Sequence, residues 1–288
     1  EIILSAGAVE SPKLLELSGI GDSARLQALG IEPLVHNPLV GENLREHRYV
    51  AVDWKVKSGS SNHSLQGIGL LAAVLRYFLL SSGPMTDAAH EVGGFIKTRP
   101  ELTRPDAQIG SMLVTMSIGA NGAPVLDKFP GMRVLGYFTR PESRGWTHIT
   151  SKDPAASPAI NANHFAEEID RRTAVDLFKW LRRLGRQPAL SQWITEETGK
   201  GAAFQTDEEI AANLLLLGGT SFHIAGTAAM GADETSVLDP QLRVRGVDGL
   251  RVCDTSIMPT LVSGNTNAPA MAIAMNAADI ILSAKANS

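Results

Sequence analysis

His223 is the residue of this chain best suited to acid–base chemistry. It follows the glycine-rich stretch LLGGTSF and precedes a second small-residue stretch, IAGTAAMG. Glycines on both sides let another molecule approach closely, and an imidazole titrates near neutral pH, as a general base requires. The competing interpretation is a structural histidine, the commoner role of a lone histidine. The pattern therefore makes His223 a candidate base.

Asp254 is a second candidate, because it ends the apolar run LRVC. Polar side chains at the carboxyl ends of strands in α/β sheets face bound ligands. The alternative role for Asp254 is to cap the turn that follows. Cys253, one residue earlier, is expected to pack as a small hydrophobic residue rather than to react.

A long helix is predicted near the carboxyl end, over APAMAIAMNAADIILSA. Pro269 is tolerated only in a first turn, so Asn267 or Ala268 must lie where the helix begins. Residues 263–267, which include Asn265, then lie in front of a helix amino terminus, where unpaired N–H groups attract an electron-rich ligand. The alternative is that the asparagines only cap and turn the chain.

Composition and motif content exclude several classes of function. The 26 Lys+Arg against 30 Asp+Glu give a formal net charge of −4, so no nucleic-acid partner is expected. The single cysteine excludes a disulfide within the chain and fits a reducing, cytoplasmic compartment. His90, His148 and His164 lack matched ligand spacing, so no metal site is predicted. The G-x-S-x-G, P-loop lysine and G-x-G-x-x-G motifs do not occur.

The most apolar stretch, GIGLLAAVLRYFLL over residues 67–80, is too short to cross a membrane. A spanning helix needs roughly 20 residues, and this stretch carries Arg76 within it. It therefore predicts a buried or amphipathic helix, and no membrane span is expected. The first residues show no secretory leader.

Hydrophobic periodicity divides the chain into three regions of an α/β plus α+β protein. Residues 1–48 begin with the apolar run IILSAG, predicted as a buried parallel strand, and continue into a short helix with Ser11 as N-cap and Pro12 at its first position. Residues 49–217 mix alternating segments such as RVLGYFT and GWTHITS with amphipathic helices, which predicts an antiparallel sheet. Residues 218–288 return to a strand, a loop and the final helix.

Several segments resemble the GMC (glucose–methanol–choline) oxidoreductases, a family of FAD-dependent alcohol oxidases and dehydrogenases. The matching segments, in chain order, are GAVESPKLLELSGIG, LVGENLREH, HEVGGFIKT, PESRGWTHITSKDPAASPAI, HIAGTAAMG and VDGLRVCDTSIMPTLVSGNTNAPAMAIAMNAADIIL. They extend from the first residues to the last helix. LVGENLREH has Glu46 where the family commonly has Asp, and we assign that motif no chemistry.

The resemblance implies a role for each site residue. His223 corresponds to the active-site base, and Asn265 to the second active-site position, which is His in some members and Asn in others. The residues that correspond to FAD-binding positions are Ala6, Gly7, Asp254, Thr266, Asn267 and Ala268. In this interpretation residues 1–48 and 218–288 form part of a Rossmann-like FAD-binding lobe, and residues 49–217 form the substrate-binding domain.

The implied reaction is FAD-dependent oxidation of an alcohol to an aldehyde or ketone, by hydride transfer to flavin N5 with His223 as base. Family members that bind FAD but act as hydroxynitrile lyases are an alternative, and so is a fragment that is inactive alone. Family members are roughly twice as long and carry a G-x-G-x-x-G motif near their amino terminus. The resemblance therefore predicts two partners, a small-molecule alcohol and the amino-terminal half of the same enzyme.

Overall fold

The computed structural model describes residues 1–286, which form two compact units. Unit 1 comprises residues 1–47, 139–170 and those from Thr220 onward, whereas unit 2 comprises residues 48–138 and 171–219. The predicted boundaries near 48 and 217 fall beside unit boundaries. Residues 139–170 differ from the prediction, because they were placed in the middle domain and cluster with unit 1.

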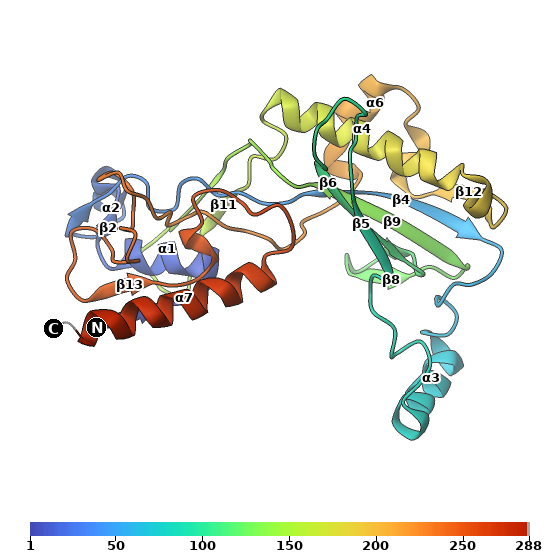
Figure 1. The fold of residues 1–288 in the computed structure, drawn as a ribbon, viewed down its shortest axis with the longest axis horizontal. Helices are drawn as coiled ribbons and strands as arrows, with labels where there is room; N and C mark the ends of the chain where they lie inside the picture. Colours follow the sequence, from blue (N-terminus) through green and yellow to red (C-terminus); the bar gives the residue numbers. More distant parts are fainter. Residues whose placement is uncertain (287–288) are drawn as a thin grey trace. The chain divides into compact units, whose positions relative to one another are not determined.

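The centre of unit 2 is a five-stranded antiparallel sheet in the order β12-β4-β9-β6-β5 (Figure 1). Its strands are β4 (Tyr49–Val56), β5 (Val92–Ile96), β6 (Ala107–Met112), β9 (Gly131–Phe138) and β12 (Ile194–Thr198). Side chains alternate between the two faces of a strand, so Val50, Val52 and Trp54 are buried together on one face of β4. This sheet confirms the antiparallel arrangement predicted for the middle of the chain.

Helix α4 (Glu168–Gly185) buries its apolar stripe in unit 2. Leu177, Phe178 and Leu181 are fully buried, and a Cβ added at Gly185 would lie 2.4 Å from Cζ2 of Trp54. The end of α4 therefore contacts β4 directly. The remaining elements of unit 2 are α3 (Gly67–Leu80), β7 (Met116–Ile118), β8 (Pro124–Leu126), α5 (Pro188–Ser191), η1 (Lys200–Ala203), α6 (Asp207–Ala212) and η2 (Leu214–Leu216).

Unit 1 joins the two ends of the chain through a parallel pair of strands, β1 (Ile2–Leu4) and β13 (Leu250–Val252). Its core includes Leu15, Val252 and Ile257. The other elements of unit 1 are α1 (Gly7–Leu17), β2 (Ile20–Gly21), α2 (Ser23–Ala28), β3 (Val35–His36), β10 (Trp146–His148), β11 (Ala159–Asn161), η3 (Thr255–Ile257) and α7 (Asn267–Ala286).

The first strand, the first helix and the last helix of unit 1 differ in how well they match the predictions. The first strand is parallel as predicted, but Ile2 and Ile3 are exposed rather than buried. Helix α1 begins at Gly7, so Ser11 is not its N-cap, and Ser11 instead uses its hydroxyl to contact another segment. The last helix begins at Asn267, as the position of Pro269 predicts.

Helix α3 (Figure 1) coincides with the apolar stretch 67–80. Most of its large side chains are exposed. The expectation of a buried helix was therefore wrong, whereas the alternative of an amphipathic helix stays a prediction. Within residues 1–286 no helix is both long and apolar enough to cross a membrane.

Candidate active site

The structure brings His223 and Asn265 into direct contact within unit 1. Nδ2 of Asn265 lies 3.2 Å from Nε2 of His223, although 42 residues separate them in sequence. Asn265 lies two residues before α7, in the loop that the sequence predicted for it. His223 is only 8% exposed. The imidazole and the carboxamide are therefore adjacent, with the ring largely shielded from water.

A second histidine, His47, contacts the other nitrogen of the His223 ring. Its Nδ1 lies 3.1 Å from Nδ1 of His223, and the two rings meet edge to face with centroids 5.2 Å apart. His47 is fully buried. His47 was not predicted as a site residue, because LVGENLREH was assigned no chemistry. The resemblance of this segment to the family motif was the signal that could have found it.

The hydrogen-bond partners assign the protons on both rings. Nε2 of His47 lies 3.2 Å from the carbonyl oxygen of Thr139, which can only accept, so Nε2 carries the hydrogen. In a neutral His47 ring, Nδ1 is then the acceptor, and the hydrogen between the two rings comes from Nδ1 of His223. The lone pair of His223 therefore lies on Nε2, the atom that the Asn265 amide contacts.

Burial keeps both imidazoles neutral. It lowers the pKa of His47 to about 4; the Thr139 carbonyl acts in the opposite direction, and the neighbouring His223 lowers the pKa slightly further. Burial also lowers the pKa of His223 below its ordinary value. At neutral pH His223 is consequently an unprotonated acceptor, which is the state that a general base needs.

The segment 45–47 places His47 by running antiparallel to the segment that carries His223. Arg45 and Ala225 exchange both backbone hydrogen bonds at 3.0 Å, and the amide of Ser221 donates to the His47 carbonyl at 3.1 Å. Gly226 follows with φ +92°, and a Cβ there would lie 2.5 Å from the Asn43 carbonyl oxygen, so only glycine fits the close approach.

Glu46 holds the turn that precedes His223. Its carboxylate accepts hydrogen bonds from the hydroxyl of Thr220 and from the amide of Phe222, the latter at 3.0 Å. Phe222 takes φ +59°, in the left-handed region that a bulky side chain rarely adopts. Glu46, which stands where the family commonly has Asp, thus stabilises a strained turn beside the candidate base.

Asp254 joins the amino-terminal segment to the carboxyl-terminal one. Its Oδ2 accepts from the amide of Gly7 at 3.0 Å and from the hydroxyl of Ser11 at 2.5 Å, and its Oδ1 accepts from the amide of Ser256 at 2.7 Å. The amide of Ala6 donates to Ser11 Oγ at 3.1 Å. Three of the predicted cofactor residues, Ala6, Gly7 and Asp254, therefore lie in one hydrogen-bond network.

The same region presents features that fit the FAD implied by the family. Gly7 has φ +87° and open space where a Cβ would stand, so a ligand can approach its backbone closely. Thr266 is buried, while Asn267 and Ala268 are exposed at the start of α7, whose first amides lack acceptors within the helix. An exposed backbone and a helix amino terminus suit a cofactor with phosphates and an electron-rich ring edge.

Hydrogen bonds also link these residues to the segment that carries the base. Thr255, next to Asp254, donates through Oγ1 to the carbonyl of Ile224, the neighbour of His223, at 3.1 Å. The amide of Gly226 donates to the Thr255 carbonyl at 3.2 Å. The predicted catalytic and cofactor residues thus belong to one connected part of unit 1.

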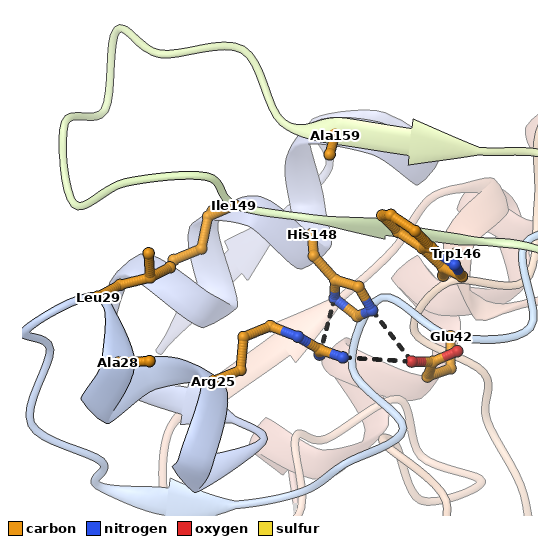
Figure 2. Close-up of a pocket in the computed structure, with 8 residues that line it drawn as sticks. All are labelled: Arg25, Ala28, Leu29, Glu42, Trp146, His148, Ile149 and Ala159. Carbon is orange, nitrogen blue, oxygen red and sulfur yellow. Dashed lines mark hydrogen bonds and ion pairs between the residues drawn. The ribbon is translucent and has the colours of Figure 1, made fainter.

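A cavity of about 520 Å³ elsewhere in unit 1 contains none of the predicted site residues (Figure 2). His148 lies between two carboxylates there, 2.8 Å from Glu16 and 3.0 Å from Glu42, with Arg25 beside it. The four side chains come from α1, α2, β10 and a loop, so the contacts of His148 and the ion pairs of Arg25 with Glu16 and Glu42 tie these elements together. Among residues 1–286 no cluster of three or more His, Cys, Asp or Glu side chains is arranged to hold a metal ion.

Comparisons with known proteins agree on one family. Two models described as GMC oxidoreductase match residues 1–49, which include His47, and residues 141–274, which include His223 and Asn265. The chain is 36% identical over 283 residues to oxygen-dependent choline dehydrogenase from Paraburkholderia phytofirmans, covering 98% of this chain and 50% of that protein. It is also 36% identical over 297 residues to alcohol dehydrogenase (acceptor) from Pseudomonas putida, covering 98% and 51% respectively.

Solved structures give the same result for the fold. Formate oxidase from Aspergillus oryzae superposes with a TM-score of 0.90 at 27% identity, covering 100% of this chain and 55% of that one. The chain spans about half the length of the curated relatives it matches.

Proposed function

Because the chain belongs to the GMC oxidoreductase family, we propose that it supplies the base and the substrate-orienting side chain of an FAD-dependent enzyme that oxidises an alcohol to an aldehyde or ketone. The observation that carries the proposal is the contact between the neutral His223 ring and Asn265, beside the start of α7. Choline and alcohol dehydrogenases among the relatives favour alcohol oxidation over cyanohydrin cleavage.

His223 removes the hydroxyl proton of the substrate through Nε2. The hydrogen-bond chain from Thr139 through His47 fixes the hydrogen of His223 on Nδ1, so Nε2 keeps its lone pair. A positioned general base contributes about 10²–10⁴-fold to such a reaction. FAD, when bound, supplies the acceptor for the hydride that leaves the alcohol carbon.

Asn265 orients the alcohol. In the structure its amide donates a hydrogen bond to Nε2 of His223 at 3.2 Å. An alcohol hydroxyl must take the place of this amide to give its proton to Nε2. The substrate therefore displaces this hydrogen bond, and Asn265 donates to the alcohol oxygen instead. A carboxamide has no charge to change, so it holds the oxygen without competing for the proton.

The residues that would hold FAD in this chain are Ala6, Gly7, Asp254, Thr266, Asn267 and Ala268. Gly7 offers its open backbone, Asp254 fixes that backbone through the 3.0 Å hydrogen bond, and the first turn of α7 offers amide donors. In this proposal unit 1 is part of a Rossmann-like FAD-binding lobe and unit 2 binds substrate. The cytoplasmic location expected from the sequence stays a prediction.

The remainder of a family-length enzyme is the second proposed partner of this chain. The relatives are about twice as long, and unit 1 leaves Ile2, Ile3 and Met275 exposed on a parallel sheet and a helix. Parallel strands are normally covered on both faces, so additional polypeptide is needed to bury these side chains.

The test is single-turnover reduction of the flavin in the complete enzyme, mixed without oxygen with a series of alcohols. We expect the wild type to lose its oxidised-flavin absorbance with at least one alcohol. His223→Ala should retain bound flavin but be reduced about 10²–10⁴-fold more slowly. His36→Ala, an exposed histidine of unit 1, is the matched control and should behave as the wild type.

Two results would contradict the proposal. Unchanged reduction in His223→Ala would remove the base from the mechanism. A wild-type flavin that no alcohol bleaches, in an enzyme that cleaves cyanohydrins, would place the protein among the lyases of the family.

A further inference from the structure

The turn directly before His223 decides where the candidate base stands. Phe222 precedes His223 in the chain, and its backbone takes φ +59°, in the left-handed region that residues other than glycine rarely adopt. The Phe222 side chain is 83% exposed, so packing within residues 1–286 does not offset this strain. Other contacts in unit 1 must therefore hold the turn.

Hydrogen bonds to Glu46 and His47 hold all three residues of this turn. Oε1 of Glu46 accepts from the hydroxyl of Thr220 and from the amide of Phe222, the latter at 3.0 Å. The Phe222 amide also donates to Oγ1 of Thr220 at 3.0 Å. The amide of Ser221 donates to the carbonyl of His47 at 3.1 Å. The left-handed conformation of Phe222 thus depends on one carboxylate oxygen of Glu46, both directly and through Thr220.

This carboxylate is enclosed within unit 1. The side chain of Glu46 is only 4% exposed, and its Oε2 lies 3.6 Å from Nε2 of His164. The backbone of the neighbouring Arg45 is fixed by its two hydrogen bonds with Ala225 at 3.0 Å. Because the carboxylate and its partners are internal to this unit, their arrangement does not depend on polypeptide that covers the outside of unit 1.

Glu46 acts on the base through the backbone rather than through its charge. A carboxylate close to an imidazole raises the pKa of the imidazole, whereas burial lowers the pKa of His223 below its ordinary value. A change of φ at Phe222 to the negative range would redirect the side chain of the next residue, His223. The 3.2 Å contact between Nε2 of His223 and Nδ2 of Asn265 depends on that direction.

We propose that Glu46 is a positioning residue for the reaction, because it holds Phe222 in the left-handed conformation that keeps Nε2 of His223 beside Asn265. The inference rests on the proposed function, since the position of His223 matters to the rate only if His223 is the base. A displacement of about 1 Å can cost about 10²-fold in rate, so a small change in the turn is enough to slow the reaction.

The test is single-turnover reduction of the flavin by an alcohol in the complete enzyme. Glu46→Ala should retain bound flavin but be reduced about 10- to 100-fold more slowly, since the Phe222 amide loses its acceptor. Glu46→Gln should keep most of the wild-type rate, because its carboxamide oxygen can still accept from both donors. Glu234→Ala, at an exposed position of unit 1, is the matched control and should behave as the wild type.

Two double variants identify the route of the effect. Glycine adopts positive φ without strain, so adding Glu46→Ala to Phe222→Gly should slow reduction much less than Glu46→Ala does alone. Using Phe222→Gly as the reference removes any contribution of the phenylalanine ring. Adding Glu46→Ala to His223→Ala should slow reduction no further, whereas general damage to the fold would slow it again. If Glu46→Ala does not retain flavin, Thr220→Val takes its place in both comparisons, because it removes the hydroxyl that links Glu46 to the turn.

Three results would overturn the proposal. The first is an equal loss of rate from Glu46→Ala with phenylalanine and with glycine at position 222. The second is a Glu46→Gln variant as slow as Glu46→Ala, which would assign the effect to the charge. The third is a wild-type rate in Glu46→Ala. Failure of the proposed function gives a different result, in which no alcohol reduces the flavin or His223→Ala is reduced as fast as the wild type.

Discussion

The hydrogen-bond chain from Thr139 through His47 to His223 determines which nitrogen of the candidate base is available. A lone buried imidazole has two tautomers, and only one presents its lone pair on Nε2 toward Asn265. His47 selects that tautomer because its own hydrogen is committed to the Thr139 carbonyl. We therefore regard His47 as a positioning residue for the base.

Replacing His47 by Leu should slow flavin reduction by more than about tenfold, but by less than the 10²–10⁴-fold expected for loss of the base itself. His47→Asn should recover most of the rate, because a carboxamide can accept from Nδ1 of His223 and donate to Thr139. Stopped-flow reduction measures both, with substrate affinity as a separate readout. Equal rates for Leu and Asn would show that His47 only fills space.

The same burial makes the stability of the fold depend on pH. The pKa of His47 is about 4 in the folded state, whereas an unfolded chain titrates near its ordinary value. Between these two pH values the unfolded state binds the proton more readily, so acidification favours unfolding. The free energy of unfolding should therefore fall by up to about 1.4 kcal/mol per pH unit as pH drops below about 6.5.

Urea unfolding at several pH values measures this slope. His47→Asn cannot titrate and should show a shallower decline than the wild type, which separates His47 from the carboxylates that titrate in the same range. Parallel curves for the two proteins would exclude His47 as the source. His223, whose pKa burial also lowers, acts in the same direction in both proteins.

At the scale of elements, Asp254 connects β13 to the start of α1. Its carboxylate accepts from Gly7, Ser11 and Ser256, so Asp254→Ala leaves three donors without this acceptor. We expect the free energy of unfolding to drop by about 1–3 kcal/mol and flavin retention to fall with it. Asp248→Ala, at an exposed position, is the control, and thermal unfolding of the flavin-loaded enzyme is the measurement. Equal melting temperatures in the two variants would remove Asp254 from this role.

Elements with strong local signals were predictable from the sequence. Proline geometry placed the start of α7 at Asn267 or Ala268, and period-two alternation in RVLGYFT indicated the strand that the structure has as β9. The start of α1 was missed because its first turn is stabilised by a residue 247 positions away, which local capping rules cannot detect. Exposure of α3 was missed for a related reason, since apolar composition normally indicates burial.

The residues of the candidate site also differ in whether the sequence could predict them. His223 stands out through its glycine-rich surroundings, and its contact with Asn265 agrees with the predicted helix entrance. His47 has no such surroundings, because its importance comes from pairing with a residue 176 positions later. Spacing alone carries no information about such contacts, whereas the matching family motif did mark the segment that contains His47.

At the scale of the whole molecule, unit 1 retains apolar surface that its own residues do not cover. The β1–β13 pair is a two-stranded parallel sheet, and such sheets normally belong to larger ones with both faces covered. Ile2 is 65% exposed, and on α7 Met275 is 72% exposed. Helix α7 is apolar on most sides, which is typical of a helix surrounded by protein.

If the rest of a family-length enzyme covers this surface, the 288-residue chain produced alone should bind the dye ANS strongly, and the full-length protein should not. The amides of Ile2–Leu4 should exchange with solvent faster in the chain alone, because one side of β1 then lacks a neighbouring strand. Ile2→Lys should leave the solubility of the isolated chain unchanged or improved, since an exposed position tolerates charge. In the full-length protein it should instead lower the melting temperature, because the lysine is buried without a partner. Equal dye binding and equal exchange rates in the two proteins would show that β1 and α7 remain exposed in the complete enzyme.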